Sequence, residues 1–157
     1  SELWNFQTED SFAISDNKNS LIIVEELVVF SNSIGDITAV NVESGLITWQ
    51  LPTQSSNIIN ESYNFKTSKL VSDGKSIYFS NNKGEFYSID LKTGVTNWIN
   101  EIDSNIMPSV IGNLIFTISN EGYLYILEKN TGNIIQLILN LVNKIGQNME
   151  VIPLIQK

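Results

Sequence analysis

The chain has 157 residues, of which 42% are hydrophobic and 17% charged, a balance typical of one folded domain rather than a disordered segment. Its net charge is -8, which disfavours binding to nucleic acid or to anionic lipid, because both require a basic surface. It contains no cysteine and no histidine, so disulfides, thiolate metal sites and histidine general bases are excluded within it. No apolar run reaches the roughly 18 residues of a membrane-spanning helix.

The first predicted repeat covers residues 20–51. Its segments LIIVEE, LVVFSNS, DITAVNV and LITWQL are short, rich in β-branched residues and separated by polar turns. They predict four antiparallel strands joined by hairpins. The pair Glu25-Glu26 falls at the first hairpin turn, which indicates a solvated turn rather than an acid–base pair. Ahead of this repeat, residues 1–8 are predicted to be a strand of an incomplete blade that carries Trp4.

The segment of residues 51–68 is longer than the other connections and polar. Tyr63 and Phe65 stand out in it, and aromatic residues on a long loop are favoured anchors for a protein partner. The alternative is that Phe65 packs beneath the loop or begins a strand.

Two further repeats follow at residues 68–101 and 106–140, each with the same order of strands and turns. Residues 148–157 contain the apolar stretch MEVIPLIQK, which predicts a partial strand, the inner strand of a following blade. The chain begins at Ser1 in the middle of the repeat pattern. We therefore interpret it as a fragment or processed form of a longer protein.

The repeats are in register with one another. Three pairs of glycines are each ten residues apart: Gly35 and Gly45, Gly84 and Gly94, Gly122 and Gly132. Trp4, Trp49, Trp98 and Gln136 occupy equivalent positions at intervals of 45, 49 and 38 residues. Periods of about 40–50 residues with four strands each are typical of β-propeller blades. Consecutive apolar residues in the strands require cover on both faces, which neighbouring blades provide. The predicted fold is therefore all-β, a partial propeller of three full blades with partial end strands.

The motif SIDLKTGVTNW, residues 88–98, resembles the tryptophan-docking motif of the PQQ-like repeat family, the quinoprotein alcohol dehydrogenase-like propellers. AVNVESGLITW, residues 39–49, keeps most of the pattern, and ILEKNTGNIIQ, residues 126–136, keeps its Thr-Gly turn but has Gln136 in place of tryptophan. The resemblance implies that the following residues dock neighbouring blades: Ala39, Gly45, Trp49, Asp90, Thr93, Gly94, Trp98, Thr131 and Gly132. Because Gln136 stands in place of the tryptophan, the resemblance implies a weaker docking contact after the third repeat. The alternative role for the tryptophans, stacking on an aromatic ligand, does not require one tryptophan per repeat.

The family includes enzymes that hold pyrroloquinoline quinone and calcium, and a non-catalytic BamB-like branch that acts as a scaffold in outer-membrane protein assembly. The chain lacks the adjacent cysteines common in the enzymes, and we expect no catalytic, cofactor or metal residue in it. The resemblance therefore implies a protein-binding scaffold, periplasmic or associated with the outer membrane, whose partner belongs to the β-barrel assembly machinery. Two alternatives remain open, a segment of a quinoprotein dehydrogenase and the extracytoplasmic sensor domain of a signalling protein.

Three repeats cannot close a ring of the usual four to eight blades. Either the parent protein contains more blades, or copies of the chain associate through exposed blade edges.

Overall fold

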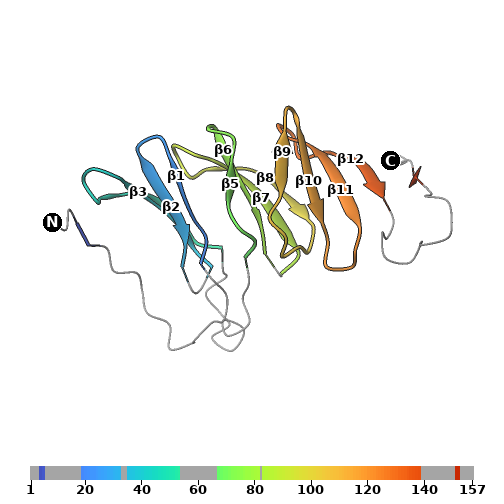
Figure 1. Cartoon of the computed structure of the whole chain (residues 1–157), viewed down its shortest axis with the longest axis horizontal. Helices are drawn as coiled ribbons and strands as arrows, with labels where there is room; N and C mark the ends of the chain where they lie inside the picture. Colours follow the sequence, from blue (N-terminus) through green and yellow to red (C-terminus); the bar gives the residue numbers. More distant parts are fainter. Residues whose placement is uncertain are drawn as a thin grey trace.

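The protein consists of three antiparallel sheets that stand side by side in chain order (Figure 1). The computed structural model describes residues 4–5, 19–32, 35–53, 67–81, 83–138 and 151–152, and no helix occurs within these ranges. The predicted fold class, all-β blades of a partial propeller, is confirmed.

Each sheet is a meander in which every strand pairs with the next one along the chain. The first contains β1 (Leu21–Val24), β2 (Leu27–Ser31), β3 (Ile37–Asn41) and β4 (Ile47–Leu51). The second contains β5 (Val71–Ser72), β6 (Ser76–Ser80), β7 (Glu85–Asp90) and β8 (Thr96–Glu101). The third contains β9 (Ser109–Ile111), β10 (Leu114–Ile118), β11 (Leu124–Glu128) and β12 (Ile134–Ile138).

A short fifth strand, β13 (Val151–Ile152), joins the outer edge of the third sheet. It pairs antiparallel with β12, with Leu137 opposite Ile152 and Ile138 opposite Val151. The prediction that this segment is the inner strand of a following blade is therefore wrong. An outer edge strand presents unpaired N–H and C=O groups, and β13 satisfies part of that edge. Of the strand predicted at residues 1–8, only Trp4 and Asn5 belong to the described residues.

The first strands of the three sheets, β1, β5 and β9, are neighbours in space. Hydroxyl groups connect the sheets at this inner side. The Leu70 N–H donates to Ser20 Oγ at 2.9 Å between the first two sheets, and Ser80 Oγ donates to the Ser104 carbonyl at 2.8 Å between the second and third. The sheets are thus held together near their inner strands by polar contacts.

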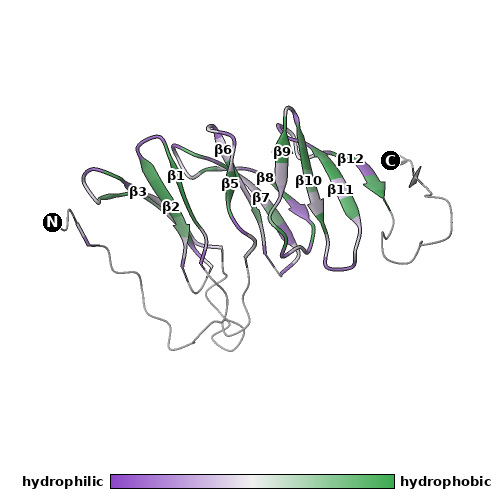
Figure 2. Ribbon diagram, viewed as in Figure 1, coloured by the Kyte–Doolittle hydropathy of each residue, from purple (hydrophilic) through white to green (hydrophobic). Residues whose placement is uncertain are grey.

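The middle parts of most strands are hydrophobic (Figure 2). Their apolar side chains form two buried clusters between the sheets. One buried cluster joins the first and second sheets and includes Val29, Ile77 and Phe79. A second joins the second and third sheets and includes Phe86, Ile115 and Leu127. Full burial of one such side chain stabilises a fold by about 1.5–3 kcal/mol, so each interface is a substantial part of the hydrophobic core.

The first hairpin turn contains an unfavourable backbone conformation. Glu25 has a φ of 52°, while Gly112, in the matching two-residue turn of the third sheet, has a φ of 59°. A side chain costs about 1–2 kcal/mol in this left-handed region, whereas glycine adopts it freely. The turn assignment of Glu25 and Glu26 agrees with their exposure.

Replacing Glu25 by glycine is therefore expected to stabilise the protein by about 0.5–1 kcal/mol, after the larger chain entropy of unfolded glycine is subtracted. Loss of the ion pair between Glu25 and Lys92 changes the stability little, because the charged atoms are 3.9 Å apart and both side chains are exposed. Urea denaturation of Glu25→Gly and of Glu26→Gly, a change in the same turn at a position without positive φ, measures the effect. Equal effects of the two changes would contradict the strain at Glu25.

Candidate functional site

The repeated motif begins with a turn closed by an acidic side chain. In the second sheet, Asp90 Oδ1 accepts hydrogen bonds from the backbone N–H groups of Lys92 and Thr93, at 3.1 and 2.8 Å, and from the Thr93 hydroxyl at 2.8 Å. The Thr93 hydroxyl and N–H are the main causes that hold the pKa of Asp90 below its usual value. Gly94 closes the turn with a φ of 71°. Asp90 and Thr93 therefore shape a turn whose last residue must be left-handed.

The other two motif turns vary this chemistry. In the first sheet, Asn41 Oδ1 accepts bonds from the N–H and the hydroxyl of Ser44, at 2.9 and 3.0 Å. In the third sheet, the longer Glu128 accepts a bond from the Thr131 hydroxyl at 2.6 Å and extends its other oxygen to the Asn113 amide at 3.4 Å. Glu128 thus links its motif turn to the first hairpin of its own sheet.

Each motif turn is accompanied by an irregularity in strand pairing. The register between the third and fourth strands shifts by one position in every sheet: at Ala39/Val40, at Ser88/Ile89 and at Ile126/Leu127. An extra residue in one strand increases its twist and changes the direction of the side chains that follow. The shift thus precedes the position of the tryptophan in the fourth strand.

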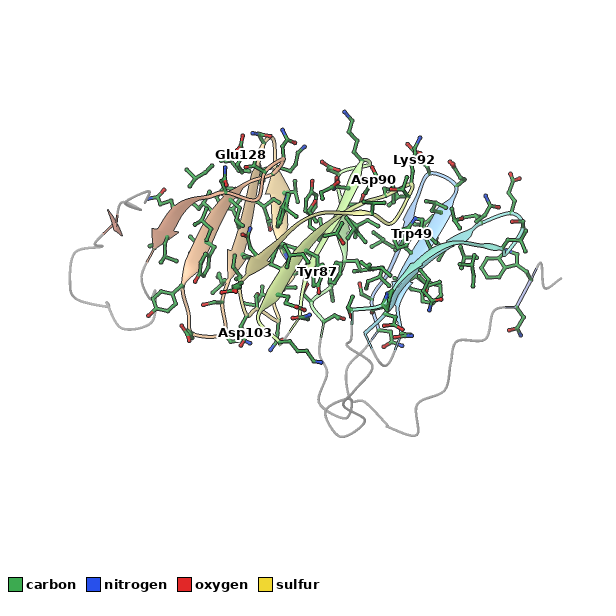
Figure 3. The ribbon with its side chains drawn as sticks, turned by 180° about the vertical axis from the view of Figure 1, so that it is seen from behind. Trp49, Tyr87, Asp90, Lys92, Asp103 and Glu128 are labelled. Carbon is green, nitrogen blue, oxygen red and sulfur yellow. The ribbon has the colours of Figure 1, made fainter. Side chains whose placement is uncertain are left out.

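The tryptophan of one sheet lies on the motif turn of the next. Trp49 is located between the first and second sheets (Figure 3), and its Nε1 donates to the Leu91 carbonyl at 2.9 Å. A Cβ atom added to Gly94 would lie 2.6 Å from the indole ring, so only glycine permits this approach. Trp4 makes the same contact with Gly45, and its Nε1 donates at 2.7 Å to the carbonyl three residues before that glycine.

The second and third sheets are joined in the same way. Trp98 Nε1 donates to the Lys129 carbonyl at 3.0 Å, and a Cβ atom on Gly132 would lie 2.6 Å from the indole. Asn100, two residues after the tryptophan, adds a bond from its amide to the Gly132 carbonyl at 2.6 Å. The sequence motif did not indicate Asn100, because the equivalent position of the first repeat is Leu51.

The structure thus brings together the three pairs Trp4 and Gly45, Trp49 and Gly94, and Trp98 and Gly132. Ala39 is fully buried opposite Trp49 in the strand pair, while Thr131 lies in an exposed turn. Gln136, at the fourth tryptophan position, lies half-buried in β12. Tyr63 and Phe65 lie outside the described residues, so their proposed role stays a prediction.

The second interface also contains an ion pair that the motif did not predict. Lys129 Nζ lies 2.8 Å from Asp73 Oδ2, and only 21% and 14% of their side chains are exposed. Burial would raise the pKa of Asp73, but the hydrogen bond from Lys129 and the N–H groups of Ser76 and Lys75 lower it to about 2. Burial and the nearby Asp73 raise the pKa of Tyr78 to about 12. Tyr78 is therefore a neutral hydroxyl beside a charged pair.

The opposite end of the same interface is acidic. A cleft of about 640 Å³ is lined by four acidic residues and one lysine: Glu85, Glu101, Asp103, Glu121 and Lys83. Figure 3 shows Asp103 at the end of the sheets away from Asp90 and Glu128. Burial and the hydrogen bond to Glu85 raise the pKa of the Tyr87 hydroxyl.

The described part of the chain offers no metal centre. No three aspartate or glutamate side chains converge closely enough there to hold an ion. A calcium ion beside pyrroloquinoline quinone requires several such oxygen ligands. The residues that the structure describes therefore do not fit that cofactor pair, and no chemical step is derived from it.

Comparison with known proteins gives the family. The family described as "Outer membrane protein assembly factor BamB" matches residues 1–136. The chain belongs to this family. No helix in the described part is long and apolar enough to cross a membrane.

Individual relatives are distant. An uncharacterized protein, RP232, of Rickettsia prowazekii (strain Madrid E) is 24% identical over 136 residues, which cover 84% of this chain and 33% of the relative. A europium-containing methanol dehydrogenase has a TM-score of 0.63 at 19% identity, over 85% of this chain and 26% of the enzyme. The quinohemoprotein alcohol dehydrogenase of Comamonas testosteroni has a TM-score of 0.60 at 15% identity, over 75% and 20%. At these identities the structural likeness shows the propeller fold alone. The chain spans about a third of its curated relative's length.

Substitution of Gly94 by alanine is expected to destabilise the protein by about 3 kcal/mol or more, because the new methyl group would overlap Trp49 in addition to the backbone strain. Gly112→Ala is the matched control. Gly112 also has a positive φ, but a Cβ there would meet no atom within 4 Å, so the strain alone of about 1–2 kcal/mol remains. Chemical denaturation of both variants measures the difference. Equal losses would mean that the Trp49–Gly94 contact contributes nothing beyond backbone conformation.

Substitution of Asp73 by asparagine is expected to cost about 1–2 kcal/mol at neutral pH, allowing for solvent screening of the partly exposed pair. The folded pKa of Asp73, about 2, lies below its ordinary value of 3.8, so its contribution is complete above pH 4 and is lost as the pH falls towards 2. Urea denaturation at pH 7 and at pH 2.5 should show the variant approaching the wild type at the lower pH. Glu43→Gln, at an exposed position of the first sheet, is the control. A difference independent of pH would contradict the ion pair.

Proposed function

We propose that this chain is a segment of a non-catalytic propeller that acts as a protein-binding scaffold, with a partner in the assembly of outer-membrane β-barrel proteins. The family supports this proposal, since its description is that of an outer-membrane protein assembly factor. The proposed location follows from the same family and is the periplasm or the periplasmic side of the outer membrane.

The observation that carries the proposal is the joint made by each tryptophan and the glycine of the following sheet. In all three joints the indole nitrogen is bonded to a backbone carbonyl and the ring lies on a glycine. We propose that the motif residues fix neighbouring blades against one another and bind no ligand. A rigid array loses little conformational entropy on binding, and this favours a scaffold that presents loops and edges to a partner.

Two places on the chain suit a partner. The outer edge of the third sheet already accepts β13 as an additional antiparallel strand, which is the geometry of strand addition by a peptide. We also propose Tyr63 and Phe65, in the long connection between the first two sheets, as aromatic anchors.

Binding of the full-length protein to the soluble domains of the β-barrel assembly machinery is expected in biolayer interferometry. The double substitution Tyr63→Ala and Phe65→Ala is expected to weaken this binding by tenfold or more, because aromatic anchors typically contribute about 2 kcal/mol or more. Leu46→Ala, at a position that is 69% exposed on a motif turn, is the control for loss of an apolar surface group and should bind normally.

Two results would contradict the proposed function. Absence of binding by the full-length protein, together with alcohol or sugar oxidation after addition of pyrroloquinoline quinone and calcium, would assign a dehydrogenase. A parent gene that encodes a transmembrane helix and a kinase domain would assign a sensor. Normal binding by the double variant would remove Tyr63 and Phe65 from the partner site while leaving the scaffold role intact.

A further inference from the structure

The interface between the second and third sheets contains a hollow of about 550 Å³ at the end that carries the motif turns. Its lining residues are all of polar or charged types and include Asp73, Lys75, Ser76, Tyr78, Ser88 and Lys129. Pockets of about 300–1,000 Å³ are of the size that holds small ligands, but most of them are lined by apolar side chains. The polarity of this hollow therefore requires an explanation.

The first interface provides an internal comparison, because the repeats are in register. Leu27 lies opposite Asn41 in the first sheet, and Ser76 lies opposite the equivalent Asp90 in the second. Ser76 of the second repeat therefore occupies the position that Leu27 occupies in the first repeat.

The same register identifies two further replacements. Ala39 and Ser88 lie opposite the tryptophans of their respective sheets. Leu91 and Lys129 each follow the acidic residue of a motif turn. The backbone carbonyl of each accepts a hydrogen bond from the tryptophan of the preceding sheet.

The three apolar residues of the first interface are buried together. Leu27, Ala39 and Leu91 have exposed fractions of 5%, 0% and 0% and belong to one apolar cluster with Trp49. The second interface has serine and lysine at these positions, so it lacks this apolar packing and buries polar groups instead. Burying a polar group lowers stability unless the group is hydrogen-bonded. Departures from a repeated core pattern are expected where a protein carries a function.

The polar groups of the hollow form one connected set. Asp73 is paired with Lys129 at 2.8 Å, and the Tyr78 hydroxyl donates to the same carboxylate at 3.4 Å. The Asn97 amide bridges the hydroxyls of Ser76 and Ser88, at 3.2 Å to each. The pair of opposite charges is neutral as a unit, and Lys75 adds one positive charge beside hydroxyl and amide groups that both donate and accept.

A lining in which hydroxyl and amide groups predominate matches a ligand that carries many hydroxyl groups. An apolar molecule would leave the hydroxyls and amides without partners, and Lys129 is already bonded to a carboxylate, so Lys75 is the lining cation that an anion such as acetate would meet. We propose that the hollow binds a small neutral polyhydroxylated molecule of the monosaccharide class. The site is separate from the scaffold role and does not depend on it.

The comparison of the two interfaces supplies the test. In the full-length protein, the triple change Ser76→Leu, Ser88→Ala and Lys129→Leu copies the apolar residues of the first interface. Titration with glucose, galactose and N-acetylglucosamine, and separately with acetate, is followed by the side-chain amide signals of Asn97 and Asn113 in nitrogen-15 NMR spectra. We expect a saturable shift with at least one sugar, none with acetate, and a loss of affinity of tenfold or more in the triple variant.

Lys92→Leu removes a lysine from the equivalent motif turn of the second sheet, away from the hollow, and should leave sugar binding unchanged. Because the triple variant changes an interface, Asn97→Ala, at an exposed position of β8, is a second variant and should also weaken binding. The proposal is overturned if no sugar produces a saturable shift at millimolar concentration, if acetate alone does so, or if both variants bind the sugar as the wild type does.

Discussion

The arrangement of the three sheets depends on one repeated contact, an indole ring packed against the glycine of a motif turn. The ring buries apolar area, and its nitrogen is bonded to the carbonyl three residues before that glycine, at 2.7–3.0 Å in the three cases. This contact tolerates no Cβ atom, so it sets both the distance between sheets and the residue type at the turn. The hydrophobic clusters then fill the space that the joints define.

The turn chemistry explains why the contact can be repeated with different side chains. Asp90, Asn41 and Glu128 all accept a hydrogen bond from the hydroxyl of the turn, and Asp90 and Asn41 also accept one from a backbone N–H group. The glycine and the carbonyl acceptor belong to the backbone, so the joint depends little on the side chains beside it. This freedom lets Leu91 and Lys129 occupy the same position in two interfaces, so that the end beside the motif turns is apolar in the first interface and polar in the second.

The sequence predicted the repeat architecture well, because strands, turns and the glycine–tryptophan spacing are local patterns. It did not indicate the Asp73–Lys129 pair, since the two residues lie on different sheets and their approach depends on how the sheets face each other. The pairing of β13 with β12 was missed for a similar reason, because an apolar segment does not specify which edge it joins. Ser76 and Ser88 looked like ordinary polar residues of strands, and only the observed register aligns them with Leu27 and Ala39.

The Trp49 and Trp98 joints are directional, because the indole comes from the earlier sheet and the glycine from the later one. Each sheet thus receives support from its predecessor and gives it to its successor, so stability is passed along the chain between nearest neighbours. At the fourth position Gln136 stands in place of the tryptophan, so the third sheet has no indole to place on a following motif turn. Local opening should therefore begin at the third sheet and spread backwards, so that amide hydrogens in β12 exchange with solvent sooner than those in β4, which carries Trp49.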